Sequence, residues 1–535
     1  MTNKLFYGDN LDVLRDQTTS DSVDLVYLDP PFNSNANYNI LFKSKTGDGS
    51  DAKIEAFEDT WHWNDHAEHA FDQVARSGNT KAFDLLNAMR GFLGENDMMA
   101  YLAMMAIRLI ELHLVLKPTG SLYLHCHPTA SHYLKLLLDG VFGVTNYVNE
   151  IVWKRSDSKN DAGQGAKHFG RVNDVILFYQ KSGGRTWNRL YEPLSHDYVK
   201  KFYKYEDPGG RRWTMDNMLR PGGTAKGNPY YEVMGVSRHW RYSRERMQQL
   251  IDDGRVVQTR SGNVPMYKRY RDDTKGTQVT TNWSDISMLR GWSAEKMPYP
   301  TQKPLALIER IISTSCPANG VVLDPFCGCG TAVHAAQKLG RQWIGIDVTH
   351  LAISLIEQRL KDAFLGIAFE VIGTPKDLAT AQDLAERDKY QFQWWAVSMV
   401  DALPSAAGRR APTGALTASS TSSPTESAPK RALVSVKRGN NVSVTMIRDL
   451  HSAMVREKAP IGVFLGAAMP TTPMIKEAAT VGRFASEATG RTYPRLQTIT
   501  LAELFQGKKP DIPLVDQASI KRAKREDMGR QDSML

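Results

Sequence analysis

The chain has 535 residues, of which 41% are hydrophobic and 23% charged, a balance that excludes a wholly disordered protein. Its four cysteines exclude a disulfide-bonded secreted scaffold and suit a reducing cytoplasm. The formal charge of +9 mildly favours a polyanionic partner. We expect no membrane span, because the longest apolar stretch, 101–116, contains Arg108, Glu111 and His113, and the first ten residues carry no signal pattern.

The first part of the chain alternates predicted strands and helices. Residues 23–28 are a continuous apolar run that predicts a buried strand, and 98–116 carry apolar residues at helical spacing. Further strands are expected at 121–125, 148–153 and 174–179. This alternation predicts an α/β fold: a doubly wound, mostly parallel sheet with helices on both faces.

The pattern changes between 183 and 297 and then returns. Basic, aromatic and glycine residues dominate 183–297, which indicates an inserted region suited to a nucleic acid; an ordinary loop-rich insertion is the alternative. Strand–helix alternation resumes after it. Strands are predicted at 321–324 and 343–347, and helices at 331–339 and 351–360.

A glycine-rich turn follows the strand at 321–324. Gly328 and Gly330 let the backbone turn sharply and approach a ligand closely before the next helix begins. Asp347, at the end of the following predicted strand, lies 23 residues after Asp324. That is near the spacing at which a carboxylate binds ribose hydroxyls, so the pattern indicates an adenosine-type cofactor. A tight turn without a ligand is the alternative.

The second motif, Asp29-Pro30-Pro31-Phe32, stands at the end of the strand at 23–28. Tandem prolines fix the backbone and remove two donors, which frees a carbonyl for a ligand. With the Asp29 carboxylate, that carbonyl could accept both hydrogens of an exocyclic amine while a base stacks on Phe32. Ligands bind at the carboxyl ends of strands in such sheets, which favours this functional interpretation.

These motifs resemble the amino-group DNA methyltransferases that use S-adenosylmethionine, in their permuted beta order. The order is Asp-Pro-Pro-Phe, a basic insertion, Thr301-Gln302-Lys303-Pro304, then the glycine turn. The resemblance implies that Asp29, Pro30, Pro31 and Phe32 bind a flipped target base. It implies a cofactor pocket formed by Asp324, Phe326, Gly328, Gly330 and Thr331, with Asp347 on the ribose, Asp9 on the adenine, and Thr301, Gln302, Lys303 and Pro304 at the methionine end. For Asp9, a helix cap is the alternative.

The resemblance implies a site-specific enzyme of a restriction-modification or epigenetic system that acts on double-stranded DNA. Family members with aspartate at the first position of this motif mostly methylate adenine N6, so we expect adenine. Cytosine N4 is the nearest alternative, and a non-catalytic DNA-binding protein with the same fold is the alternative from another class. A homodimer and a separate restriction subunit are both left open.

The remaining cysteines and histidines favour structural roles. Cys327 and Cys329 are too closely spaced for a zinc site, and small residues packing in the turn are expected instead. His125 and His127 share one face of a predicted strand, where a structural or pocket-lining role is favoured over a metal site.

The C-terminal part resembles the restriction-endonuclease-like domain attached to some of these enzymes. Lys437 fits the nuclease lysine, but Ser435 occupies the position of an acid or glutamine, and an upstream aspartate strand is missing. We therefore expect no DNA cleavage. Residues 409–427 are read either as a divergent linker or as a frameshifted stretch, which the coding DNA would decide.

Together these observations divide the chain into seven segments. They are a target-base half (1–182), a target-recognition region (183–297), a cofactor-binding half (298–375), connecting helices (376–403), a low-complexity linker or frameshifted stretch (404–430), a degenerate restriction-endonuclease-like domain (431–510) and a basic tail (511–535).

Overall fold

The computed structural model describes most of the chain, in two compact units. The described residues are 2–31, 38–41, 53–57, 63–157, 165, 167–220, 227–260, 262–297, 299, 301–400, 416–420, 430–439, 441–486, 490–513 and 525–526. One unit spans Met1–Asn188 and Thr281–Ser533, and the second spans Arg189–Thr280. Phe32 and most of the stretch 409–427 lie outside the described residues, as does most of the basic tail.

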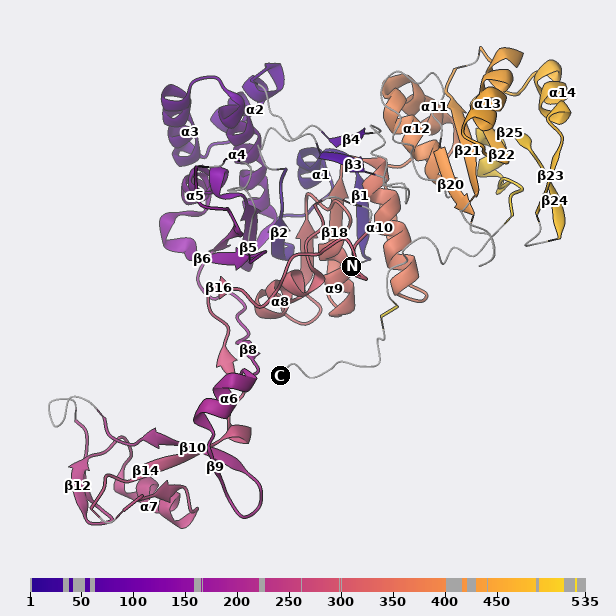
Figure 1. The fold of residues 1–535 in the computed structure, drawn as a ribbon. Helices are drawn as coiled ribbons and strands as arrows, with labels where there is room; N and C mark the ends of the chain where they lie inside the picture. The colour runs from indigo at the N-terminus through magenta and orange to yellow at the C-terminus, as the bar shows by residue number, and fades with distance from the viewer. Residues whose placement is uncertain are drawn as a thin grey trace. The chain divides into compact units, whose positions relative to one another are not determined.

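A nine-stranded sheet forms the centre of the first unit (Figure 1). Its order is β16 (Asn282–Trp283), β6 (Tyr147–Lys154), β7 (Asn173–Gln180), β5 (Leu116–Cys126), β2 (Val23–Leu28), β17 (Val321–Asp324), β18 (Gln342–Asp347), β1 (Lys4–Tyr7) and β19 (Glu370–Ile372). Every neighbouring pair is parallel except those that β7 makes with β5 and β6. The predicted α/β fold with a mostly parallel sheet is therefore confirmed.

Helices pack on this sheet because each carries one apolar face. They are α1 (Asn10–Asp16), α2 (Asp65–Arg76), α3 (Thr80–Leu93), α4 (Asp97–Val115), α5 (Pro128–Phe142), α8 (Leu305–Ser315), α9 (Thr331–Lys338) and α10 (His350–Ala363). By length and composition, α4 is apolar enough to cross a membrane, but 72% of it is buried inside the protein. Its side chains share one core with those of β2 and β5, as expected of a core helix.

The strand after α4 is longer than predicted. A strand is expected only at 121–125, yet β5 already begins at Leu116. The parallel register jumps from Val23–Leu116 to Leu25–Ser121, so the intervening residues form an irregularity within the strand. The short elements of this unit also include the 3-10 turn Val144–Asn146 and the paired strands β3 (Tyr38–Leu41) and β4 (Lys53–Phe57).

The second unit has its own small core, although its sequence shows weak periodicity. Buried aromatic side chains, Tyr231 and Trp240, pack with Met218, Met247 and Leu250. Its elements are β8 (Tyr191–Glu192), α6 (His196–Phe202), β9 (Tyr205–Glu206), β10 (Arg212–Asn217), β11 (Tyr230–Val233), β12 (Val236–His239), α7 (Arg244–Asp252), β13 (Val256–Val257), β14 (Met266–Tyr270), the 3-10 turn Arg271–Asp273 and β15 (Thr277–Gln278). The unit is narrower than the predicted 183–297, since 281–297 belong to the first unit.

The C-terminal part of the first unit contains a smaller sheet, in the order β20 (Leu416–Ser420), β21 (Lys430–Lys437), β22 (Ile461–Gly466) and β25 (Leu496–Thr500). Its other elements are α11 (Leu378–Arg387), α12 (Lys389–Ser398), α13 (Val444–Arg456), α14 (Thr472–Thr480), β23 (Arg483–Ser486), β24 (Arg491–Pro494) and α15 (Leu501–Phe505). Two expectations differ from this arrangement. The segment expected as a linker contains β20, and the expected connecting helices α11 and α12 share a core with β21, β22 and β25.

Candidate active site

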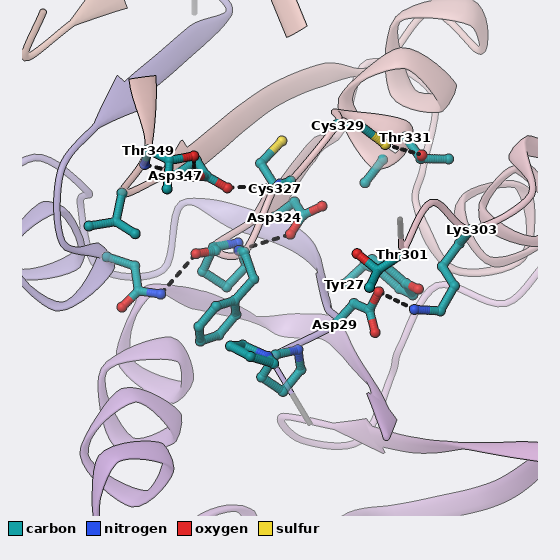
Figure 2. A pocket seen from close by; sticks show the side chains of 18 of the residues that line it. Tyr27, Asp29, Thr301, Lys303, Asp324, Cys327, Cys329, Thr331, Asp347 and Thr349 are labelled. Carbon is teal, nitrogen blue, oxygen red and sulfur yellow. Dashed lines mark hydrogen bonds and ion pairs between the residues drawn. The ribbon is translucent and has the colours of Figure 1, made fainter. Parts of the chain in front are cut away.

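A cavity of about 380 Å³ opens at the carboxyl ends of the central strands (Figure 2). Asp29 follows β2, Asp324 ends β17 and Asp347 ends β18. Because β2, β17 and β18 are parallel neighbours, these ends meet at one edge of the sheet. The two motifs, which are nearly three hundred residues apart in sequence, therefore line one cavity.

Most of the residues predicted for the site line this cavity. They are Asp9, Asp29, Pro30, Pro31, Thr301, Gln302, Lys303, Asp324, Phe326, Gly328, Thr331 and Asp347. Gly330 and Pro304 are not among the lining residues. Gly330 lies just before α9, and Pro304 is the N-cap residue of α8.

The glycine turn is held by the two carboxylates that flank it. Asp324 Oδ1 accepts a hydrogen bond from the Phe326 amide (3.0 Å), and Asp347 Oδ2 accepts one from the Gly328 amide (2.9 Å). Gly328 and Gly330 have φ angles of +54° and +76°, a region that disfavours any side chain. At Gly330 a Cβ would also lie 2.8 Å from Ile356 Cγ1, so the turn requires glycine there.

Burial raises the pKa values of the two carboxyl groups at this end of the cavity. It raises the pKa of Asp324 to about 8, an effect that the Phe326 amide opposes and the nearby Asp29 and Asp347 charges reinforce. Burial also raises the pKa of Asp347 to about 6, against hydrogen bonds from Thr349 and Gly328. A cavity with buried acids that resist ionisation favours a ligand carrying positive charge and hydroxyl groups.

The other end of the cavity contains an ion pair that the sequence does not predict. Lys303 Nζ pairs with Asp29 Oδ2, and both side chains are mostly buried. The sequence assigns Lys303 to the methionine end of a cofactor, whereas the structure places its ammonium on the carboxylate of the other motif. The pair joins residues 274 positions apart, which no local pattern reveals.

The Gln302 side chain forms hydrogen bonds with two backbone groups of the loop beside the cavity. Its Oε1 accepts from the Met297 amide (2.6 Å), and its Nε2 donates to the Glu295 carbonyl (2.8 Å). This loop places the buried Tyr299 against the turn, where a Cβ on Gly328 would lie 3.2 Å from the tyrosine ring. Gln302 and Tyr299 therefore shape the cavity wall.

Two further residues line the cavity and were not predicted from the sequence: Arg108 and Asn10. Arg108 is buried on α4, and its Nη2 donates to both carboxylate oxygens of Asp9 (2.9 and 3.0 Å). Its Nε donates to Asn10 Oδ1 (2.5 Å), and Asn10 Nδ2 donates to the Pro325 carbonyl (2.8 Å). These bonds link α4, α1 and the glycine turn. The signal available in sequence is a lone arginine in an otherwise apolar helix.

Asp9 is the helix cap that was considered as its alternative role, and it also lies at the cavity. Its Oδ1 accepts from the Leu11 amide (2.8 Å) and caps α1, and its side chain also lines the cavity. The two histidines that were considered together have different environments. His127 is the N-cap of α5, and His125 is fully buried in β5. Cys327 and Cys329 are buried free thiols in the turn, and no cluster of three metal-ligating residues occurs in the described part of the chain.

Comparison with known proteins gives consistent matches. Residues 23–358 match the N6/N4 family model described as DNA methylase. The chain is 31% identical over 263 residues to the type II methyltransferase M.EcaI of Enterobacter cloacae, covering 49% of this chain and 57% of that protein. It is 28% identical over 357 residues to the Mod subunit of the StyLTI type III restriction-modification enzyme of Salmonella typhimurium, covering 64% and 50%. The chain thus spans about half the length of these relatives.

Among solved structures, the chain aligns with the PvuII DNA methyltransferase (cytosine-N4-specific). That alignment has 11% sequence identity and a TM-score of 0.35, and covers 69% of this chain and 89% of the other.

Proposed function

Since the chain belongs to the N6/N4 DNA methylase family, we propose that it transfers a methyl group from S-adenosylmethionine to an exocyclic amino group of DNA, with adenine N6 as the acceptor. The observation that carries the proposal is the cavity shared by Asp29 and the glycine turn around Gly328. A methyl donor on the turn and an amine on Asp29 would face one another there. The order of the motifs supports the permuted beta class.

The cofactor assignment rests on the chemistry of the cavity. Asp324 and Asp347 offer carboxyl oxygens to a cationic, hydroxyl-bearing ligand, and Arg108 orients Asp9 beside them. When bound, S-adenosylmethionine supplies an electrophilic methyl group on a sulfonium. The chain's own contribution at this end is to bind and orient that ligand and to exclude water.

At the other end, the chain holds the acceptor. Asp29 and the carbonyl of Pro30 would accept the two amine hydrogens, so that the nitrogen lone pair points at the methyl group. Lys303 holds the Asp29 carboxylate in place. The base must leave the duplex to reach the cavity, at a cost of roughly a few kcal/mol for unstacking. Positioning and electrostatics provide most of the rate, and no covalent enzyme intermediate is required.

The second unit is proposed to recognise the DNA. Its exposed arginines and aromatic residues are the side chains that contact phosphates and bases. They include Arg241, Arg244, Arg246 and the half-exposed Tyr230. The similarity to restriction-modification proteins supports a role in such a system, acting on double-stranded DNA in the cytoplasm.

The decisive measurement is the identity of the methylated base. The full chain is incubated with S-adenosylmethionine and unmethylated genomic DNA, and the nucleosides are separated by mass spectrometry. We expect N6-methyladenine from the wild type and none from Asp29→Ala. N4-methylcytosine would instead support the alternative base, and DNA binding without any methylated product would support the non-catalytic alternative.

The C-terminal part is proposed to be a restriction-endonuclease-like domain without nuclease activity. Ser435 is fully buried in β21 at the position where a metal-binding acid would be needed, and a neutral hydroxyl is a poor ligand for Mg²⁺. We expect supercoiled plasmid to stay intact with the purified chain and Mg²⁺. Nicking that EDTA abolishes would contradict this expectation.

A further inference from the structure

A chain of three buried side chains leads from the cavity into the sheet. Tyr27, on β2, lines the cavity, and its hydroxyl lies 3.0 Å from His125 Nδ1 on β5. The other ring nitrogen, His125 Nε2, lies 3.3 Å from Asp174 Oδ2 on β7. All three residues are at most 3% exposed. Burying three polar side chains costs free energy unless their hydrogen-bonding groups are paired, so this hydrogen-bonded series indicates a functional role.

The surroundings hold this chain rigidly. The ring of Trp153 meets His125 edge-on at 5.6 Å, and the Trp153 indole donates to the Ile286 carbonyl (2.7 Å). Asp174 Oδ1 faces Arg155 Nε at 3.5 Å. The charged groups that act on the chain are Asp29 and Asp324 near Tyr27, and Arg155 and Lys303 near Asp174.

The bonding pattern assigns the protons. Burial alone would raise the pKa of Asp174, but the hydrogen bond from His125 and the charges of Arg155 and Lys303 act against it, and that pKa is lowered. An ionised Asp174 only accepts, so Nε2 donates to it, and we assign Nδ1 as the acceptor from the Tyr27 hydroxyl. Burial and nearby carboxylates raise the pKa of Tyr27 well above its usual value, which keeps the phenol neutral. Its oxygen has no other hydrogen-bond partner among the described residues.

Tyr27 stands where a proton acceptor is needed. Side chains two residues apart on a strand share a face, so Tyr27 lies on the same face as Asp29 at the strand end. In Figure 2 both side chains are seen in the cavity wall beside Lys303. The Asp29 carboxylate is already paired with the Lys303 ammonium. The methylated amine must lose a proton, and the phenolic oxygen is the nearby acceptor connected to a base.

We propose that Tyr27 is a catalytic residue that accepts the proton leaving the methylated amine, and that His125 and Asp174 are the positioning residues behind it. This rests on the proposed methyl transfer. The nitrogen–hydrogen bond of the amine breaks and an O–H bond forms at Tyr27. At the same time, the original O–H bond of Tyr27 breaks and an N–H bond forms at His125 Nδ1. Asp174 stabilises the resulting imidazolium, and the proton returns to solvent by the same route after the DNA leaves.

The test measures single-turnover methyl transfer by the full chain, with radiolabelled S-adenosylmethionine and unmethylated genomic DNA, from pH 6 to 9 in H₂O and D₂O. Tyr27→Phe should lower the rate about 100-fold and remove the solvent isotope effect, with cofactor affinity unchanged. Asp174→Asn should lower the rate and shift the pH profile to lower pH, because the His125 imidazolium loses the carboxylate that stabilises it. Asp174→Glu should restore part of both.

Tyr123→Phe is the matched control. Tyr123 lies beside Tyr27 in the neighbouring strand, is equally buried, and bonds to Ser315 Oγ (2.7 Å) instead of lining the cavity. This variant should keep the wild-type rate, pH profile and isotope effect. The proposal is wrong if Tyr27→Phe behaves like Tyr123→Phe, or if its slower transfer keeps the wild-type pH profile and isotope effect; methyl transfer itself would then stand. A wild-type chain that binds cofactor and DNA but transfers no methyl group would overturn both proposals.

Discussion

At the scale of single residues, the least ordinary group in the cavity is Asp324. Its pKa of about 8 arises from burial at the end of β17, with the negative charges of Asp29 and Asp347 nearby. Such a carboxyl is largely protonated at neutral pH. It becomes fully charged only when the pH rises above about 8 or when a cation binds beside it.

Cofactor affinity should therefore depend on pH. Below about 8, binding the sulfonium must displace the proton of Asp324, so affinity should rise with pH by up to about tenfold per unit until that value is passed. Titration calorimetry between pH 6.5 and 9 measures this. S-adenosylhomocysteine, which has no sulfonium charge, should show a much weaker dependence.

Asp324→Asn provides the control for this prediction. The amide keeps the size of the carboxyl but does not titrate, so the pH dependence of S-adenosylmethionine affinity should disappear. An unchanged slope in this variant would mean that another group controls binding.

The sequence predicts residues whose role is local, and it misses those that act across the fold. Asp29 and Gly328 each belong to a short contiguous motif that directly follows a predicted strand. Their place at the cavity therefore follows from the predicted strand–helix alternation. Arg108 and Tyr27 reach the cavity only because α4 and β2 pack as they do. The signals in the sequence are indirect: Arg108 is a charge in an apolar helix, and Tyr27 stands two residues before Asp29 on a predicted strand.

At the scale of elements, the strand, glycine turn and helix from Val321 to Lys338 form the most constrained segment of the site. Gly330 is in the left-handed region and directly precedes α9, with Ile356 of α10 packed against its Cα. Alanine there would meet both backbone strain and a steric clash. The requirement for glycine at 330 therefore depends partly on α10, a helix that comes later in the sequence.

Gly330→Ala should lower the free energy of unfolding by about 2–3 kcal/mol and weaken cofactor binding. Gly340 is the matched control, because its φ is +67° but no atom lies within 4 Å of the position that a Cβ would take. Gly340→Ala should cost about 1 kcal/mol from strain alone and leave cofactor affinity unchanged. Urea denaturation and calorimetry compare the two. Equal destabilisation would show that the contact with Ile356 adds nothing.

Strand positions were predicted more accurately than strand directions and lengths. The strands at 23–28, 148–153 and 174–179 all occur, with ends shifted by one residue or less. β7 runs antiparallel to both β5 and β6, and the early start of β5 depends on pairing with β2. Both are tertiary effects, which hydrophobic periodicity does not encode.

At the scale of the whole molecule, the proposed chemistry and the proposed DNA recognition belong to separate units. Every residue that lines the cavity belongs to the first unit. The second unit begins and ends in a pair of antiparallel strands, β8 and β15, in which Tyr191 faces Gln278. Its entry and exit points are therefore close together. The sequence predicts an insertion here but not its core, because aromatic residues such as Tyr231 come from short strands without a clear period.

Replacing Arg189–Thr280 with a short glycine–serine linker should leave cofactor affinity little changed, because the cavity keeps all its residues. DNA affinity should fall about 1,000-fold, toward the non-specific level. Calorimetry with S-adenosylmethionine and a gel-shift titration with DNA measure the two effects. Loss of cofactor binding together with DNA binding would mean that the units do not fold independently.

The paired strands β8 and β15 also bear on how such enzymes diversify. The second unit connects to the first through two adjacent strands. A segment connected in this way can be exchanged for another of different length without altering the residues that line the cavity. If the second unit recognises the DNA as proposed, exchanging it would change the target sequence and leave the proposed site of methyl transfer unaltered.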